Sequence, residues 1–264
     1  MGPMMDRAGL LRAYDEQLRT DAEVANALAV ERYGPLYLAT YEGGRGFITY
    51  RHLGTADVDD LVMAAMARYR SDPTIEEVEW KTRAHDLAPG LHDVLIGHGF
   101  VPEEPESIMV GEAAALTVEV PLPDGVALHR VSDESDVRAM CGMQDIAFGS
   151  NDADRMTREL LRRLQSGEGL ELWVAEAGGR IVSAGRLELV QDSAFAGVWG
   201  GATLDEWRGR GIYRALTAAR ARSALARGKT LIHSDSTEYS RPILERSGLV
   251  RVSTTTPYVW RRPA

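Results

Sequence analysis

The same order of elements occurs twice in this chain of 264 residues, once near the end of each half. In both places a β-prone segment is followed by a turn, a short helix-prone segment, a glycine and another β-prone segment. The two stretches are EVEWKTRAHD…LHDVLIGHGFVPEEPESIMV and TLIHSDSTEYSRPILERSGLVRVSTTTPYVW. Few of their residues are identical, but a recurring order of elements is typical of a duplicated structural unit. We therefore expect two similar domains, 1–120 and 121–264, joined where Pro121, Pro123, Asp124 and Gly125 interrupt regular structure.

Hydrophobic periodicity predicts a mixed α/β (α+β) fold in both domains, with mostly antiparallel strands. In the first domain the predicted elements are a helix over 9–30, a hairpin over 35–50, a helix that begins at Asp57, a strand over 78–82, a short helix over 91–96 and a strand over 107–111. In the second they are strands over 126–131, 170–177, 181–191, 195–204, 230–235, 249–255 and 257–261, and helices over 133–148, 152–165, 211–227 and 239–247.

Composition excludes several classes of protein. With 44% hydrophobic and 26% charged residues, the chain is neither disordered nor fibrous. No apolar run approaches the roughly 18 residues of a membrane helix, and no secretory signal is visible. The single cysteine, Cys141, fits an apolar helix face and forbids an intrachain disulfide. The six histidines show no HExxH spacing, so we expect no metal site, and we expect a cytoplasmic protein that does not associate with membranes.

Charge is divided unevenly along the chain. Residues 1–120 carry 10 basic and 21 acidic side chains, whereas residues 121–264 carry 20 and 18. An acidic first half argues against a nucleic-acid partner, because phosphate binding needs a basic face. The acidity has two readings: it keeps the protein soluble, or it attracts a cationic substrate. Nothing in the sequence indicates an oligomeric state.

The segment from Gly200 to Leu216 has the pattern that most clearly suggests a ligand-binding site. A predicted strand ends here, a turn with two glycines and two arginines follows, and a long amphipathic helix begins. Glycines allow successive backbone N–H groups to point into one concavity, and the helix N-terminus adds partial positive charge. Such a turn suits a pyrophosphate. Its spacing is neither that of a P-loop nor that of GxGxxG, and by itself it is equally well explained as a tight connection.

In its context this segment resembles the acyl-CoA loop of the GNAT acetyltransferase superfamily. The motif RxxGxG/A appears as Arg208-x-x-Gly211-x-Tyr213, after two antiparallel strands, and the resemblance covers about residues 126–262. It implies two GNAT-like domains, each a mixed, mostly antiparallel sheet flanked by helices. It also implies acetyl-CoA as co-substrate, with the pantetheine paired like an added strand along Gly201–Thr203. The residues that it assigns to the cofactor are Gly201, Ala202, Thr203, Arg208, Gly209, Arg210, Gly211, Ile212, Tyr213 and Arg214.

The sequence departs from the family pattern at three positions. Tyr213 replaces the last small residue of the motif, Thr237 stands where many members have Asn, and Leu244 stands where many have a tyrosine general acid. The tyrosine role is therefore not carried over to this chain.

Four residues are candidates for proton transfer. Glu188, Glu206 and His233 are candidate bases, and Tyr239 is a candidate replacement for the missing acid. Three of them have a structural alternative: a surface carboxylate for Glu188, and packing for His233 and Tyr239. A chain of water molecules is a further alternative to all of them.

The first half contains a second match to the motif, from Arg51 to Ala56. Its helix opens with Asp57, Asp59 and Asp60, which place carboxylates where a pyrophosphate would have to lie. We therefore interpret residues 1–120 as a degenerate GNAT-like domain without CoA.

These observations predict an acyl-CoA-dependent N-acetyltransferase that acts by direct attack of a small-molecule or peptide amine, which we expect to be cationic. Two alternatives remain open: a non-catalytic acyl-CoA-binding or regulatory module, and an acyltransferase for longer acyl chains.

Overall fold

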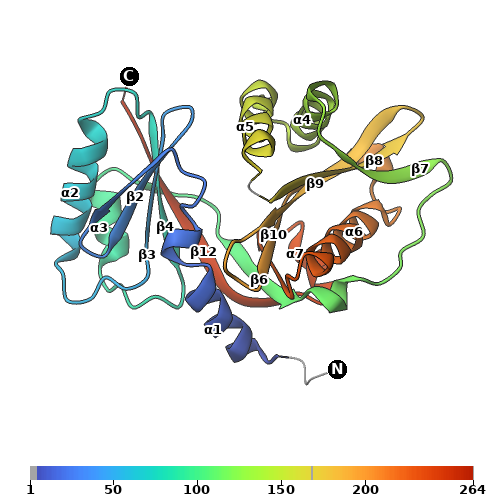
Figure 1. The fold of residues 1–264 in the computed structure, drawn as a ribbon. Coiled ribbons are helices and arrows are strands. Elements are labelled where there is room, and N and C mark those ends of the chain that lie inside the picture. The colour runs from blue at the N-terminus through green and yellow to red at the C-terminus, as the bar shows by residue number, and fades with distance from the viewer. Residues whose placement is uncertain (1–4, 168, 264) are drawn as a thin grey trace. The chain divides into compact units, whose positions relative to one another are not determined.

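The computed structural model describes residues 5–167 and 169–263, which form two compact units (Figure 1). The N-terminal unit comprises residues 8–108 and 251–263, and the C-terminal unit comprises residues 5–7 and 109–250. The expected division at residue 120 differs from these units at both ends. Residues 109–120 lie in the C-terminal unit, and the last strand of the chain lies in the N-terminal unit. The first four positions of the expected N-terminal domain are outside the described residues.

The C-terminal unit is an α/β layer structure built on a sheet with the strand order β6-β11-β10-β9-β8-β7. Its elements are β6 (Glu106–Glu112), η2 (Ala113–Leu116), β7 (Val126–Val131), α4 (Glu134–Phe148), α5 (Ala153–Ser166), β8 (Leu170–Ala177), β9 (Arg180–Leu189), β10 (Phe195–Thr203), η3 (Asp205–Trp207), α6 (Ile212–Ala226), β11 (Leu231–Ser236) and α7 (Arg241–Arg246). In Figure 1, α4 and α5 lie on one side of β8–β10 and α6 lies on the other.

The N-terminal unit has the strand order β1-β2-β3-β4-β12, with the short β5 paired to β12. Its elements are α1 (Arg7–Gln17), η1 (Thr20–Ala22), β1 (Ala29–Tyr33), β2 (Leu36–Tyr41), β3 (Arg45–Tyr50), α2 (Val58–Arg70), β4 (Glu77–Arg83), α3 (Leu91–Gly97), β5 (Val101–Pro102) and β12 (Val250–Arg261). Its core packs α2 and α3 against the sheet and includes Trp80, Phe100 and Trp260.

The repeated order predicted from the sequence is present in both units. A helix links two parallel neighbouring strands, and a short helix then leads to the next strand: β3-α2-β4-α3 in one unit and β10-α6-β11-α7 in the other. The pairs β1–β2, β2–β3, β4–β12, β7–β8, β8–β9 and β9–β10 are antiparallel. The predicted fold class, a mixed and mostly antiparallel sheet flanked by helices in each half, is therefore confirmed.

Two predicted elements were wrong. The helix expected over 9–30 ends at Gln17, and residues 29–33 form the strand β1 instead. Leu28 lies at helical spacing from Val24, but its side chain is 56% exposed, so it does not belong to a buried helix face. The two strands expected after residue 248 are a single strand, β12, in which Pro257 pairs with Lys81 of β4.

Cys141 lies in the core between α4 and the sheet, as its pattern predicts. Burial raises the pKa of its thiol, which keeps the thiol in its unreactive neutral form.

Candidate functional site

The site begins where two parallel strands part. The parallel ladder joins Phe195–Gly197 of β10 to Leu231–His233 of β11, and in the described residues it goes no further. β10 nevertheless continues to Thr203, and β11 continues to Ser236. Beyond Gly197, therefore, the edge of β10 that faces β11 has backbone donors and acceptors outside the ladder. An extended molecule can pair with such an edge as an added strand.

A bulge in β10 follows directly. The register between β9 and β10 shifts between Trp199 and Ala202, and Gly200 takes a φ of 58°, a left-handed value that favours glycine. The buried Gln144 of α4 donates from Nε2 to the Gly200 carbonyl oxygen over 2.6 Å. Because the peptide bonds of the described chain are trans, the N–H of Gly201 points away from that carbonyl. Gln144 thus fixes the orientation of the Gly200–Gly201 peptide.

The loop after β10 leads into α6 through two glycines with left-handed backbone. Gly209 has a φ of 74°, and Gly211 has a φ of 81° at the N-cap of α6. No side chain caps this helix, so the amides of its first turn are available to an anion. A Cβ on Gly209 would have no heavy atom within 4 Å, so the loop is open at this point.

The two arginines of the loop have different partners. Arg208 Nε donates to the Thr203 carbonyl over 3.1 Å, and its Nη1 lies 2.8 Å from Asp205 Oδ1. The Arg210 guanidinium lies over the Trp207 ring, 5.0 Å from its centroid. Arg208 therefore holds the loop against the end of β10, a structural role that its place in the motif does not reveal.

Gly201 explains how the chain accommodates Tyr213. A Cβ on Gly201 would lie 2.5 Å from Cε2 and 2.9 Å from the hydroxyl oxygen of Tyr213. The tyrosine ring of α6 thus packs on bare backbone of β10. The bulky residue at the last motif position is compensated by the absence of a side chain on the strand.

The strand register brings two of the candidate catalytic residues into one row. Glu188 of β9 and His233 of β11 both pair with Gly197 of β10, one from each side. His233 packs edge-on against Phe195 and Trp199, with ring centroids 5.8 and 5.1 Å away. The absence of a side chain on Gly197 leaves room for the Trp199 indole and the His233 imidazole.

Glu188 is held between two arginines. Arg163 of α5 donates to both of its carboxylate oxygens, over 3.2 and 2.8 Å, and Arg186 Nε donates to Oε1 over 3.1 Å. Burial alone would raise the pKa of Glu188, but the charges of Arg186 and Arg163 outweigh it and hold that pKa below its usual range. A carboxylate with a lowered pKa is a weak base, so this arrangement favours the structural role of Glu188.

A family model described as an acetyltransferase (GNAT) domain matches residues 126–234, a range that contains the split strands, the bulge and the glycine loop. We call residues 126–234 the GNAT domain because of this match. A search of the curated proteins finds no match to this sequence.

Solved structures extend the likeness in fold beyond the GNAT domain. A GCN5-related N-acetyltransferase from Kribbella flavida has a TM-score of 0.69 and 15% identity, with 98% of this chain and 95% of that chain covered. A tandem GNAT protein from the clavulanic acid biosynthesis pathway has a TM-score of 0.62 and 12% identity, covering 87% and 79%. A GCN5-related N-acetyltransferase from Sphaerobacter thermophilus has a TM-score of 0.62 and 18% identity, covering 87% and 78%. The likeness in fold thus spans both halves of the chain.

The other residues considered for proton transfer lie outside the strands β9, β10 and β11. Tyr239 follows β11 and is 92% exposed. Leu244, where many members have the tyrosine, is buried in the core behind the sheet. Glu206 is exposed and forms a 3.2 Å ion pair with Arg180.

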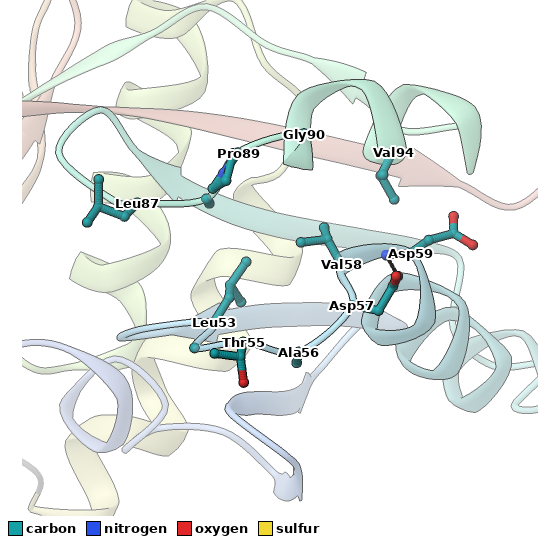
Figure 2. Close-up of a pocket in the computed structure, with 12 residues that line it drawn as sticks. Leu53, Thr55, Ala56, Asp57, Val58, Asp59, Leu87, Pro89, Gly90 and Val94 are labelled. Atoms are coloured by element: carbon teal, nitrogen blue, oxygen red, sulfur yellow. Dashed lines mark hydrogen bonds between the residues drawn. The ribbon is translucent and has the colours of Figure 1, made fainter.

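The second motif lies at a pocket of about 570 Å³ in the N-terminal unit (Figure 2). Asp57 is the N-cap of α2, and its Oδ1 accepts from the backbone N–H groups of Asp59 and Asp60 over 2.9 and 3.2 Å. A side-chain carboxylate therefore already takes up the first-turn amides, the groups that remain uncapped in the GNAT domain. The pocket wall is otherwise mainly apolar, with Leu53, Val58 and Val94 turned toward it.

The described residues contain no group of three or more His, Cys, Asp or Glu side chains placed to hold a metal ion. None of their helices is long and apolar enough to cross a membrane.

Proposed function

We propose that the chain is an acetyl-CoA-dependent N-acetyltransferase whose GNAT domain transfers the acetyl group to a small-molecule or peptide amine. One observation carries this proposal: in the domain that matches the family, the strands β10 and β11 separate beside an uncapped, glycine-rich helix start. The first feature suits a pantetheine chain, and the second suits a pyrophosphate.

In this proposal the backbone from 209 to 214 holds the pyrophosphate, and Gly201–Thr203 pair with the pantetheine. Gln144 aims the Gly201 N–H away from α4, and we assign that N–H to the thioester carbonyl oxygen, where negative charge develops. Arg208 is a positioning residue for the loop, whereas Arg210 and Arg214 add positive charge beside it.

The reaction needs one proton transfer before bond formation. An alkyl ammonium, with a pKa of about 10.4, must lose a proton before its nitrogen bonds to the acetyl carbon. The C–S bond then breaks, the thiolate of CoA leaves, and the second proton on the new amide nitrogen passes to that thiolate. We propose His233 as the base, directly or through a water molecule. His233 lies at the split, beside Trp199. Glu188 is instead paired with two arginines, and Tyr239 is exposed to solvent.

A second candidate function is an acyl-CoA-binding module without catalysis. It is favoured by the burial of Leu244 where many relatives have a general acid, and by the exposure of Tyr239. Thiolates leave without much help, because their pKa is about 8.5, so the missing acid does not exclude the enzyme. We therefore rank the enzyme first.

The class of acceptor and the cellular location are proposals that rest on the sequence. The excess of acidic residues in 1–120 supports an acceptor that carries a protonated amine, whose capture would weaken as salt rises. The single, buried cysteine supports a reducing, cytoplasmic location.

Calorimetry with acetyl-CoA tests the site, with two variants matched in backbone strain. Gly209→Ala and Gly228→Ala both place a side chain at positive φ, 74° and 77°, in open space, but only Gly209 lies in the loop. A left-handed alanine costs roughly 1–2 kcal/mol in either variant. In Gly209→Ala the loop can relieve this strain only by leaving the conformation that holds the pyrophosphate, so we expect acetyl-CoA affinity to fall about tenfold in Gly209→Ala and to be retained in Gly228→Ala. Equal affinities would locate the cofactor elsewhere.

An assay of CoA release with a panel of amines separates the two candidate functions. Turnover with any amine supports the enzyme. Tight acetyl-CoA binding without release for the whole panel would support the binding module.

A further inference from the structure

We infer that the acceptor amine also carries a carboxylate, and that Arg186 of β9 binds it. This inference rests on the proposed function and names the substrate class for the same site.

Arg186 lies beside the bulge that marks the reaction centre. It pairs in register with Trp199, so both side chains are on the face of the sheet that α4 and α5 cover. Its Nη1 would lie 3.2 Å from a Cβ built on Gly200, and the Gln144 amide would lie 3.1 Å from the same point. A guanidinium and an amide thus border the residue that precedes the proposed oxyanion N–H.

Glu188 compensates the charge of Arg186 only in part. Arg163 donates to both oxygens of Glu188, so Arg186 shares this carboxylate with a second arginine. The side chain of Arg186 is 18% exposed, so solvent compensates its remaining charge poorly.

The outer edge of the Arg186 guanidinium is the part with the weakest partners. Its Nε is used by Glu188, whereas Nη1 contacts the Met156 sulfur over 3.6 Å, and a thioether is a weak acceptor. Within the described residues, no oxygen accepts a hydrogen bond from either of its terminal nitrogens. That edge matches a carboxylate, which accepts two parallel N–H bonds from one guanidinium.

The position of Arg186 also limits the distance between the two groups of the acceptor. The carboxylate would lie beside Gly200, and the thioester is expected beside Gly201–Thr203. Because consecutive Cα atoms are about 3.8 Å apart, an amine separated from its carboxylate by about one to three carbon atoms spans the gap. The flat indole of Trp199 offers these carbons an apolar surface.

This substrate class refines the expectation of a cationic amine. The reacting group is still an ammonium at neutral pH, but the whole acceptor is a zwitterion. Its recognition therefore depends on a local guanidinium rather than on the net charge of residues 1–120.

The test compares matched acceptors in the CoA-release assay on the full chain. Glycine, β-alanine and 4-aminobutyrate are each compared with the corresponding amide, and rates are expressed per deprotonated amine. We expect kcat/KM at least tenfold higher for the best amino acid than for its amide. In Arg186→Gln this ratio should fall to about one, through the KM of the acceptor, with the KM of acetyl-CoA unchanged.

Two further variants exclude a merely structural effect. Arg158→Gln removes an exposed arginine of α5 and should keep the wild-type ratio. Arg186→Lys keeps the charge next to Glu188 and should retain part of the preference for the amino acid over its amide. If thermal melting shows that Arg186→Gln is unfolded, Arg186→Lys becomes the decisive variant.

The outcomes separate this inference from the proposed function. Release from amines with no preference for the carboxylate in the wild type, or a preference that survives both Arg186 variants, overturns the inference alone. No release from any amine overturns both, whether or not acetyl-CoA binds.

Discussion

At the scale of single residues, Glu188 illustrates why a polar residue on a central strand is hard to interpret from sequence. It pairs with Gly197, in the same row of the sheet as the proposed base His233. Its partner Arg163 comes from a helix whose arginines follow a pattern typical of a solvated face, yet Arg163 is 5% exposed. Only the packing of α5 on the sheet reveals the pair.

Replacing Glu188 by Gln should destabilise the native state by about 3 kcal/mol at pH 7, because two poorly exposed arginines lose their carboxylate. The native pKa of Glu188 is lowered from that of the unfolded chain, about 4.3, so its ionised form stabilises the fold above that pH. This contribution is lost as the pH falls through the native pKa. Urea unfolding should therefore show a wild-type advantage that is large at pH 7 and shrinks below about pH 4.

A surface pair provides the control for this prediction. Glu206→Gln removes the exposed partner of Arg180 and should cost no more than about 1 kcal/mol at pH 7. Equal costs for the two variants would contradict a stabilising role for the buried pair.

At the scale of elements, the sequence predicted the GNAT domain well because its signals are local. The helix 211–227, the three preceding strands and the glycine loop were all confirmed within a few residues. The bulge in β10 was not predicted. Its determinant, Gln144, lies 56 residues away on α4, and only its position among apolar residues on a buried helix face could have pointed to it.

Gln144→Ala should lower the free energy of unfolding by about 1–3 kcal/mol, because the Gly200 carbonyl loses its buried donor. Since the Gly200–Gly201 peptide is then free to reorient, kcat should fall more than the affinity for acetyl-CoA. Gln165→Ala, at an exposed position of α5, is the control and should change neither quantity. Urea unfolding and steady-state kinetics measure the two effects, and an unchanged kcat would rule out the positioning role.

At the scale of the whole molecule, the two motif matches predict one acetyl-CoA per chain. The amides at the start of α2 are taken by Asp57, and Asp59 and Asp60 add negative charge beside them. Titration with acetyl-CoA should therefore saturate at one equivalent, and Gly209→Ala should weaken that single event. A second equivalent that persists in Gly209→Ala would place a cofactor in the N-terminal unit.

The boundary between the units could not be found in the sequence because a strand pairing of long range decides it. β12 is the last strand of the chain, yet its register runs from Thr255 opposite Arg83 to Arg261 opposite Glu77. A fragment of residues 121–264, cut at the proline-rich linker, would carry β12 without β4. Cuts that respect the units must keep residues 251–263 with the N-terminal unit.

Trp260 of β12 allows a test of whether the N-terminal unit depends on β12 for its stability. It is 5% exposed, packs in the core of the N-terminal unit, and has the guanidinium groups of Arg70 and Arg262 each 5.6 Å from its ring centroid. Truncating a buried tryptophan costs about 3–5 kcal/mol, so in Trp260→Ala we expect hydrogen exchange to accelerate at the amides of β2–β4, more than 170 residues earlier in the chain. Leu87→Ala removes a side chain that is 94% exposed in the same unit and should leave exchange unchanged. Because β12 supplies core rather than a terminal extension, protection of β2–β4 that survives the loss of Trp260 would contradict the division of the chain into these units.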